Sequence, residues 1–193
     1  MHFHEQLKKY VPANEQEARD RELMLSWLEL GEIVYTRKCL SAHMTASGWV
    51  TNRDHSKILM AYHRIYDSWA WLGGHADGDQ NLLYVAMKEA KEEAGLAHVR
   101  AVSEELFSVE VLTVSGHRKN GIYVPSHLHL NATYLLEADE SEAIHEKSDE
   151  NKGVKWFPLD ECTAASSEPW MNEWIYQKLL DKMSSFEYQQ KIE

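Results

Sequence analysis

The chain has 193 residues, which is enough for one domain with a sizeable core, or for one modest domain that carries extra helices. Lys and Arg number 20 against 31 Asp and Glu, so the net charge is −11, and 44% of the residues are hydrophobic. These values exclude a disordered or collagen-like chain. A polymeric nucleic acid is not an expected partner, because the sequence has no cluster of cations to neutralise its phosphates.

The sequence also contains features that indicate the cellular compartment of the protein. No apolar run approaches the roughly 18 residues that a membrane helix needs, so no contact with a membrane is expected. The first residues, MHFHEQLKKY, lack the apolar core of a signal peptide. Cys39 and Cys162 are the only cysteines, too few for a disulfide scaffold and without the spacing of a metal site. We therefore expect a cytoplasmic protein.

The first predicted element is a helix over residues 14–30. Asn14 can cap its first turn, Glu17 follows three residues later, and apolar residues recur at helical spacing. This helix is expected to cover a sheet edge or a partner. Two strand-like runs, 43–52 and 57–64, are separated by a polar turn and predict a hairpin.

The middle of the chain alternates between glycine-rich, helical and strand-like segments. Residues 69–79 are predicted as a loop because they are rich in glycine and aspartate. A helix is predicted over 81–94, with Gly95 at the place of a left-handed terminating residue. Alternating or β-branched side chains predict three further strands, at residues 106–116, 127–136 and 153–157.

The last part of the chain is predicted to be helical. An acidic loop over 137–152 precedes the last strand, a short helix opens after Pro158, and a longer helix covers 168–186. The apolar stripe of this helix packs on the core or forms a dimer contact, so a homodimer stays open. Strands and helices are mixed, which indicates a single α/β domain flanked by helices.

Three glutamates of the predicted helix 81–94 share one side. At about 100° per residue, Glu89, Glu92 and Glu93 occupy one arc of roughly 100°, and the apolar side chains occupy another. One interpretation is a solvated helix whose lysines offset the acids. The other is a site for a hard cation such as Mg²⁺, which prefers oxygen ligands and the phosphates of a substrate. The glycines upstream favour the second interpretation.

The segment from Gly74 to Leu96 resembles the 23-residue box of the Nudix hydrolases. Five positions beyond the first glycine match in register, namely Glu89, Glu92, Glu93, Gly95 and Leu96. Two positions depart: Gln80 stands where the family has glutamate, and Lys88 where it has arginine. A Gln–Lys pair could keep a hydrogen bond between loop and helix while losing the bidentate ion pair.

The resemblance implies a fold and a domain plan. The resemblance extends over roughly residues 43–161 and implies a Nudix-like α/β/α sandwich with a mixed sheet, and the helices predicted outside this range are additions at both ends without a counterpart in the resemblance. The whole chain, 1–193, forms a single Nudix-like domain. Its parts are an N-terminal helical extension over 1–35, a core over 43–161 and C-terminal helices over 162–193.

The resemblance also implies an activity, which is hydrolysis of a pyrophosphate bond in a nucleoside diphosphate linked to another moiety. The cofactor is Mg²⁺ or Mn²⁺, because the charge on the phosphates must be neutralised while water attacks phosphorus. Glu89 and Glu93 are the first choice as metal ligands, with the Gly73 carbonyl. Glu92 is a further ligand or the base. Glu150, ahead of the last strand, is a candidate to complete the catalytic site, or else an exposed acid in an acidic loop.

Histidines and a lysine are the candidate substrate contacts. His127 and His129 project from the same face of a predicted strand. They contact a phosphate or carboxylate, bind zinc with a third ligand that the sequence does not indicate, or line a solvent-facing strand. His75 follows the glycines and reaches a phosphate or caps the loop. Lys88 is expected to contact the substrate.

Three other functions remain open. The departures at Gln80 and Lys88 fit a non-catalytic Nudix-like module that binds a nucleotide or regulates. Isomerisation of an allylic diphosphate uses a cysteine in the site of related folds, whereas Cys39 and Cys162 fall outside the box. An interaction-only protein would use its helices as a partner surface.

Overall fold

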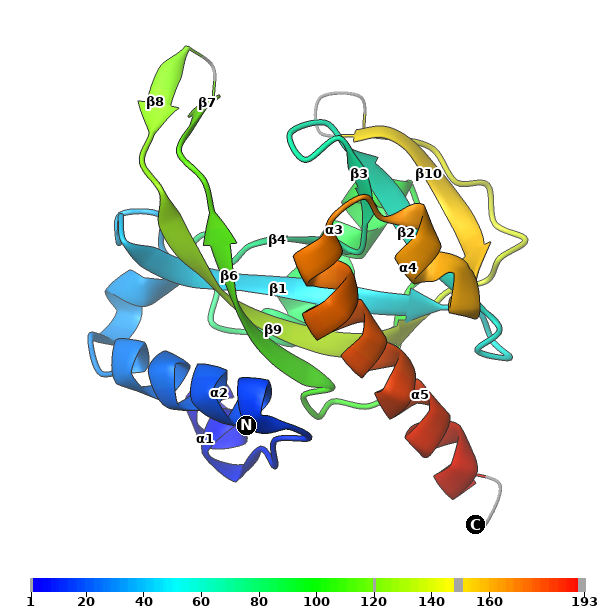
Figure 1. The fold of residues 1–193 in the computed structure, drawn as a ribbon, viewed down its shortest axis with the longest axis horizontal. Coiled ribbons are helices and arrows are strands. Elements are labelled where there is room, and N and C mark those ends of the chain that lie inside the picture. The colour runs from blue at the N-terminus through cyan, green and yellow to red at the C-terminus, as the bar shows by residue number, and fades with distance from the viewer. Residues whose placement is uncertain (1, 120, 148–150, 191–193) are drawn as a thin grey trace.

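The computed structural model describes residues 2–119, 121–147 and 151–190, with side chains described through residue 186. It places a large sheet between helices (Figure 1). The helical segments are α1 (Phe3–Lys9), α2 (Glu15–Leu28), η1 (Gly31–Tyr35), α3 (Leu82–Ala94), η2 (Leu159–Glu161), α4 (Cys162–Ala165), η3 (Met171–Tyr176) and α5 (Gln177–Gln190). The strands are β1 (Ala42–Thr51), β2 (Lys57–His63), β3 (Ser68–Ala70), β4 (Leu72–His75), β5 (Arg100–Ala101), β6 (Ser108–Val114), β7 (His117–Lys119), β8 (Ile122–Val124), β9 (His127–Glu137) and β10 (Asn151–Pro158).

The eight-stranded sheet is mixed, as expected. Its main order is β10-β2-β1-β9-β5, with β3 on β2, β4 on β1 and β6 on β9. Strands β1 and β9 are parallel along their lengths, from Ala42 opposite Leu128 to Thr51 opposite Glu137, and the other pairs are antiparallel. Strands β7 and β8 form a separate hairpin that projects from the sheet (Figure 1).

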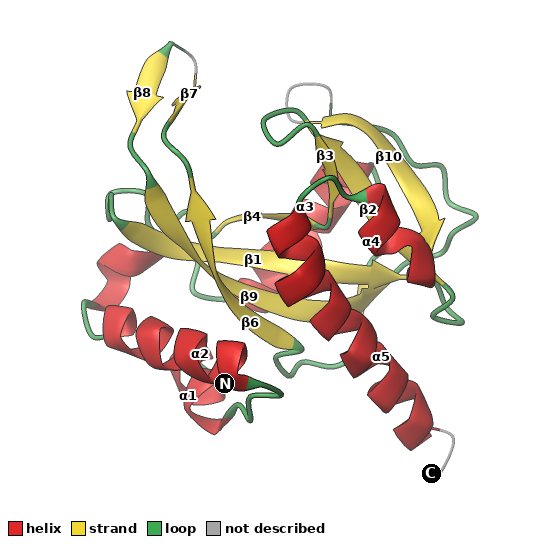
Figure 2. Cartoon of the chain, viewed as in Figure 1, coloured by secondary structure: helices red, strands yellow, loops and turns green. Residues whose placement is uncertain are grey.

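Helices cover both faces of the sheet (Figure 2). One core cluster joins α1, α2 and α3 to the face that carries Met44, Leu130 and Ala132. The other joins η3 and α5 to the face that carries Trp49 and Leu135. Because strand side chains alternate between the two faces of the sheet, they contribute to two separate cores. The result is the expected three-layer arrangement, with the sheet between two layers of helices.

The glycine-rich segment 69–79 is not wholly a loop, and in this respect the sequence-based prediction is wrong. Residues 68–70 and 72–75 form β3 and β4. A Cβ atom on Gly73 would lie 2.6 Å from the Ala46 carbonyl oxygen, and one on Gly74 would lie 2.5 Å from the carboxyl carbon of Glu89. These glycines allow a short strand to pack closely between β1 and α3. Two adjacent glycines are also typical of a turn, which is why the sequence alone predicts a loop here.

Most other predicted elements are confirmed. The Asn14 side chain accepts a hydrogen bond from the Glu17 amide and caps α2, and α3 ends at Gly95 with φ +68°. The predicted hairpin is β1–β2, joined through Thr51 and Ile58. Helix α1 and the β7–β8 hairpin were not predicted, because these short segments lack a clear hydrophobic period.

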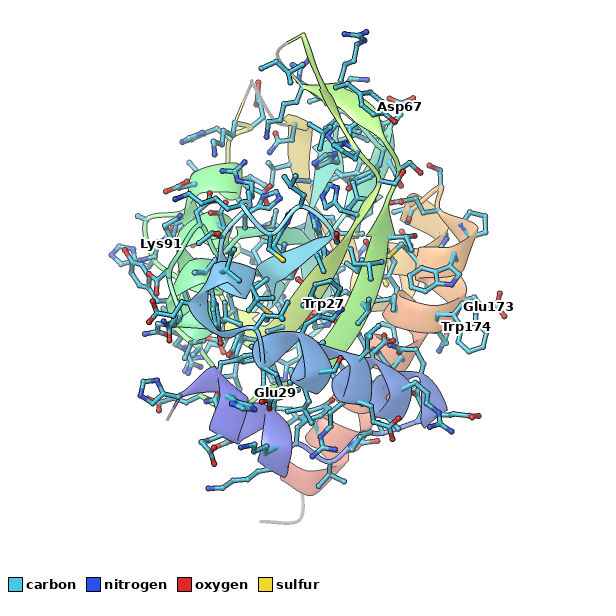
Figure 3. All side chains as sticks on the ribbon, turned by 90° about the vertical axis from the view of Figure 1, so that its left-hand side faces the viewer. Trp27, Glu29, Asp67, Lys91, Glu173 and Trp174 are labelled. Carbon is cyan, nitrogen blue, oxygen red and sulfur yellow. The ribbon has the colours of Figure 1, made fainter. Side chains whose placement is uncertain are left out.

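The predicted C-terminal helix is present, with a π-helical stretch at η3. Ile175, Leu179 and Met183 of its apolar stripe are buried in the core. Trp174 is exposed, and Figure 3 shows it beside Glu173 on the outer side of the C-terminal helices. The stripe is therefore mainly a core contact. Among the described helices, none has both the length and the apolar character that a membrane span requires.

Candidate active site

Helix α3 presents two of the three predicted glutamates to the sheet. Glu89 is 9% exposed and Glu93 is 5% exposed, whereas the Glu92 side chain is 46% exposed. The helix is fixed in this rotation because Leu82, Val85, Ala86 and Ala90 are buried on its apolar side. The helix thus holds two carboxylates, four residues apart, against the sheet.

The two buried carboxylates meet the glycines of β4. Glu93 Oε2 accepts a hydrogen bond from the Gly73 amide at 2.9 Å. Glu89 lies against Gly74, since any side chain there would collide with its carboxyl group. The end of the helix is fixed by Asn151, whose side-chain amide donates to the Glu93 carbonyl at 3.0 Å. Asn151 was not predicted, because its role depends on the pairing of β10 with β2.

The two residues that depart from the family pattern do not join each other in the way the sequence suggests. The Gln80 amide donates to the Glu32 carboxylate at 3.2 Å, which ties the loop to η1. Lys88 Nζ lies 3.0 Å from Glu89 Oε1, and this hydrogen bond raises the pKa of Lys88. The positively charged ammonium group of Lys88 therefore lies beside Glu89, which is one of the candidate metal ligands.

The other two candidate acids differ from this pair. Glu92 points toward Lys147 of the acidic segment, with 3.6 Å between Lys147 Nζ and Glu92 Oε2. Glu150 lies outside the described residues. The three glutamates of α3 do not form the compact trio that the helical arc suggests, and the roles of Glu92 and Glu150 stay predictions.

The pair Glu89 and Glu93, with the backbone of Gly73, suits a hard divalent cation. Both carboxylates supply the oxygen donors that Mg²⁺ and Mn²⁺ prefer. A side chain at Gly74 would occupy the space against the Glu89 carboxyl group, and the glycine leaves that space open. The donor set therefore fits the predicted cofactor, with Lys88 as a competing charge at Glu89.

The predicted histidines lie on the opposite face of β4 from Glu89. His75 of β4 and His127 and His129 of β9 are brought together with His43 of β1, which sequence analysis missed. His43 sits opposite His129 in the parallel β1–β9 pairing. Its only sequence signal was its place in a predicted strand, because the partner of that strand is far away in the sequence.

Burial controls the charge of these rings. It lowers the pKa of His75 to about 3 and that of His129 to about 2, and it also lowers the pKa of His43. The positive charge of Arg37 also lowers the pKa of His75, and electrostatic coupling between the His75 and His129 rings also lowers the pKa of His129. His43, His75 and His129 are therefore neutral at pH 7 and do not offer positive charge to a phosphate.

A buried polar row continues from the histidines along the same face. Asn131 Oδ1 accepts hydrogen bonds from Thr45 and Ser47, each at 2.9 Å. The Asn131 amide and the Thr133 hydroxyl donate to Glu110 Oε2 at 3.0 and 2.8 Å. The polar face that the sequence predicts for the strand 127–136 is therefore internal.

Comparisons with known proteins agree with this fold. The family model described as NUDIX domain matches residues 41–178. No match to a curated protein sequence was found. Among solved structures, the C. elegans Ap4A hydrolase is 18% identical, with a TM-score of 0.54, covering 76% of this chain and 98% of that one.

Two further structures share the fold. The E. coli dihydroneopterin triphosphate pyrophosphohydrolase is 16% identical with a TM-score of 0.51, and the match covers 70% of this chain and 92% of that one. The Nudix hydrolase RenU from M. smegmatis is 15% identical with a TM-score of 0.52, covering 74% of this chain and 86% of that one. The family match spans well over half of the sequence. The chain therefore belongs to the Nudix family of hydrolases.

Proposed function

We propose that this chain hydrolyses a pyrophosphate bond in a nucleoside diphosphate linked to another moiety, using Mg²⁺ or Mn²⁺ bound at Glu89 and Glu93. The observation that carries the proposal is the placement of these two buried carboxylates against Gly73 and Gly74. The E. coli and C. elegans structures with this fold are named for reactions of phosphate anhydrides, which supports the same substrate class.

Each residue has a defined task in this proposal. Glu89, Glu93 and the Gly73 carbonyl hold the ion, which when bound neutralises the pyrophosphate oxygens and polarises phosphorus toward attack by water. Glu92 is a further ligand or accepts the proton of the attacking water, and Glu150 is a second candidate for that step. With Glu89 holding an ion, Lys88 would be free to contact a phosphate oxygen of the substrate.

The test is a panel of nucleoside triphosphates, nucleotide sugars, dinucleoside polyphosphates and ADP-ribose, assayed for phosphate or mononucleotide release with Mg²⁺ and with Mn²⁺. We expect metal-dependent turnover of at least one member.

Glu93→Gln should lower kcat about 100-fold or more, because it removes a charge that stabilises the transition state. Glu29→Gln is the control, since Glu29 is exposed at the end of α2 (Figure 3) and should leave turnover unchanged. Absence of turnover with both metals across the panel would contradict the proposal.

A second candidate is a non-catalytic module that binds a nucleotide. The ion pair between Lys88 and Glu89 favours it, because an ammonium group already neutralises one of the two buried acids. Calorimetry separates the two candidates. A binding module would bind a nucleotide without releasing product, and Glu93→Gln would leave its affinity nearly unchanged, whereas the enzyme would lose metal-dependent turnover.

A further inference from the structure

Three strands bring three imidazoles to one point on the sheet. His43, His75 and His129 come from β1, β4 and β9, and one ligand nitrogen of each lies within 4.8 Å of the others. Among the described residues, no other group of three or more histidine, cysteine or acidic side chains brings its ligand atoms this close together. The three glutamates of α3 do not form such a group.

His43 is oriented like a metal ligand. Its Nδ1 lies 3.1 Å from the Cys39 carbonyl oxygen, to which it donates its proton, so the lone pair is on Nε2. His43 is 5% exposed, and its Nε2 is buried with no hydrogen-bond partner among the described residues. Leaving a buried acceptor unsatisfied costs about 1–3 kcal/mol. A backbone carbonyl that fixes the tautomer of a histidine is the usual support of a metal ligand.

His127 places a further ring nitrogen beside His129. Its Nδ1 donates to the Pro125 carbonyl oxygen at 2.8 Å, and its Nε2 lies 3.2 Å from His129 Nε2. Two nitrogens bound to one tetrahedral zinc ion are about 3.3 Å apart, given Zn–N bonds of about 2.0–2.1 Å. His127 also lines an open hollow of ≈ 370 Å³ between the ends of β6 and β9, which gives an ion a path from solvent.

We propose that His43, His75 and His129 bind a divalent transition-metal ion of the zinc type, with His127 as the nearest fourth donor. The donor set consists of imidazoles, which suit Zn²⁺, Co²⁺, Ni²⁺ and Cu²⁺ rather than Mg²⁺ or Ca²⁺. The site is separate from the proposed Mg²⁺ site. Along β4, Gly74 faces Glu89, and the next residue, His75, projects to the other side of the sheet. The bound ion links β4 to β1 and β9.

The experiment uses the full chain without an affinity tag, stripped with a chelator and dialysed. Calorimetry with Zn²⁺, followed by metal analysis after gel filtration, measures affinity and retained metal, and Co²⁺ is added to a second sample for its visible absorption. We expect stoichiometric retention of Zn²⁺, a higher Tm with Zn²⁺ than without it, and the intense visible bands of tetrahedral Co²⁺.

Matched variants locate the ion. His129→Gln and, independently, His43→Gln should weaken Zn²⁺ binding by about 100-fold or more. His98→Gln is the control, because His98 is exposed and paired with Glu142 on the surface. Glu93→Gln should retain Zn²⁺, so a failure of this site leaves the proposed hydrolysis untouched. The proposal is overturned if the wild-type chain retains no Zn²⁺, or if His98→Gln weakens binding as much as the ligand variants do.

Discussion

At the scale of single residues, Gly74 is required because of its neighbour. It has no unusual backbone angle, but a Cβ there would lie 2.5 Å from the carboxyl carbon of Glu89. We expect Gly74→Ala to displace Glu89 and to lower kcat by about 10-fold or more, since small misplacements of a catalytic group are costly. Metal-dependent turnover and circular dichroism measure activity and folding separately.

The control for this prediction is another strand glycine. A Cβ on Gly153 of β10 would meet only Trp69, at an ordinary contact distance of 3.8 Å. Gly153→Ala should therefore keep its activity. If Gly74→Ala is as active as Gly153→Ala, then Glu89 is not held in place for the reaction.

The sequence predicts some of the candidate site residues and misses others for a physical reason. Glu89 and Glu93 follow from local information, because the helical period and the adjacent apolar residues fix the direction of a helix face. His43 does not, because it meets His129 only through the parallel pairing of β1 with β9, two strands far apart in the chain. The alternation of side chains along a strand shows which residues share a face, but it does not show which other strand lies beside it.

At the scale of elements, the C-terminal end of α3 is fixed by Gly95. Its φ of +68° is in the left-handed region, and a Cβ there would collide with the ring of His145. Gly95→Ala combines backbone strain of about 1–2 kcal/mol with this collision. We expect it to reduce the free energy of unfolding by more than 2 kcal/mol, as measured by urea denaturation.

Gly31→Ala separates the two effects. Gly31 also has a positive φ, +74°, but no atom lies within 4 Å of its Cβ position. This variant should show the backbone strain alone, about 1–2 kcal/mol. Equal losses for the two variants would mean that His145 moves away without cost.

The elements differ in how far local sequence determines them. Helices α2 and α3 are predicted with their caps, because Asn14 and Gly95 act on their own helices. Strand β4 is predicted as a loop, because two adjacent glycines such as Gly73 and Gly74 are typical of a turn. In the structure these glycines allow close packing instead. The tertiary neighbours of β4 decide its structure, and they are not visible in the segment itself.

At the scale of the whole molecule, a buried charge network joins the two ends of the chain. Glu17 of α2 and Glu110 of β6 are fully buried, and Lys178 of α5 lies 3.4 and 3.0 Å from their carboxylates. Lys178→Met would leave buried carboxylates with less compensation. We expect the free energy of unfolding to fall by about 3–5 kcal/mol.

The control for this network is an ion pair at the surface. Lys8 pairs with Glu5 at 3.3 Å, with both side chains about half exposed. Lys8→Met should change the free energy of unfolding by about 0.5 kcal/mol or less. A small effect of Lys178→Met, close to that of Lys8→Met, would show that the network contributes little to holding α5 against the sheet.

The same network sets a pH dependence of stability. Burial acts to raise the pKa of Glu17, but Lys178 and Lys182 outweigh it and lower the pKa below its ordinary value of 4.5. Just below pH 4.5 the unfolded chain therefore binds a proton that the folded chain does not. The Glu17 contribution is complete above pH 4.5 and is lost as the pH falls through the folded pKa. Urea denaturation between pH 7 and pH 3 should show this loss, with a shallower decline in Glu17→Gln. Parallel declines in the two proteins would place the acid sensitivity elsewhere.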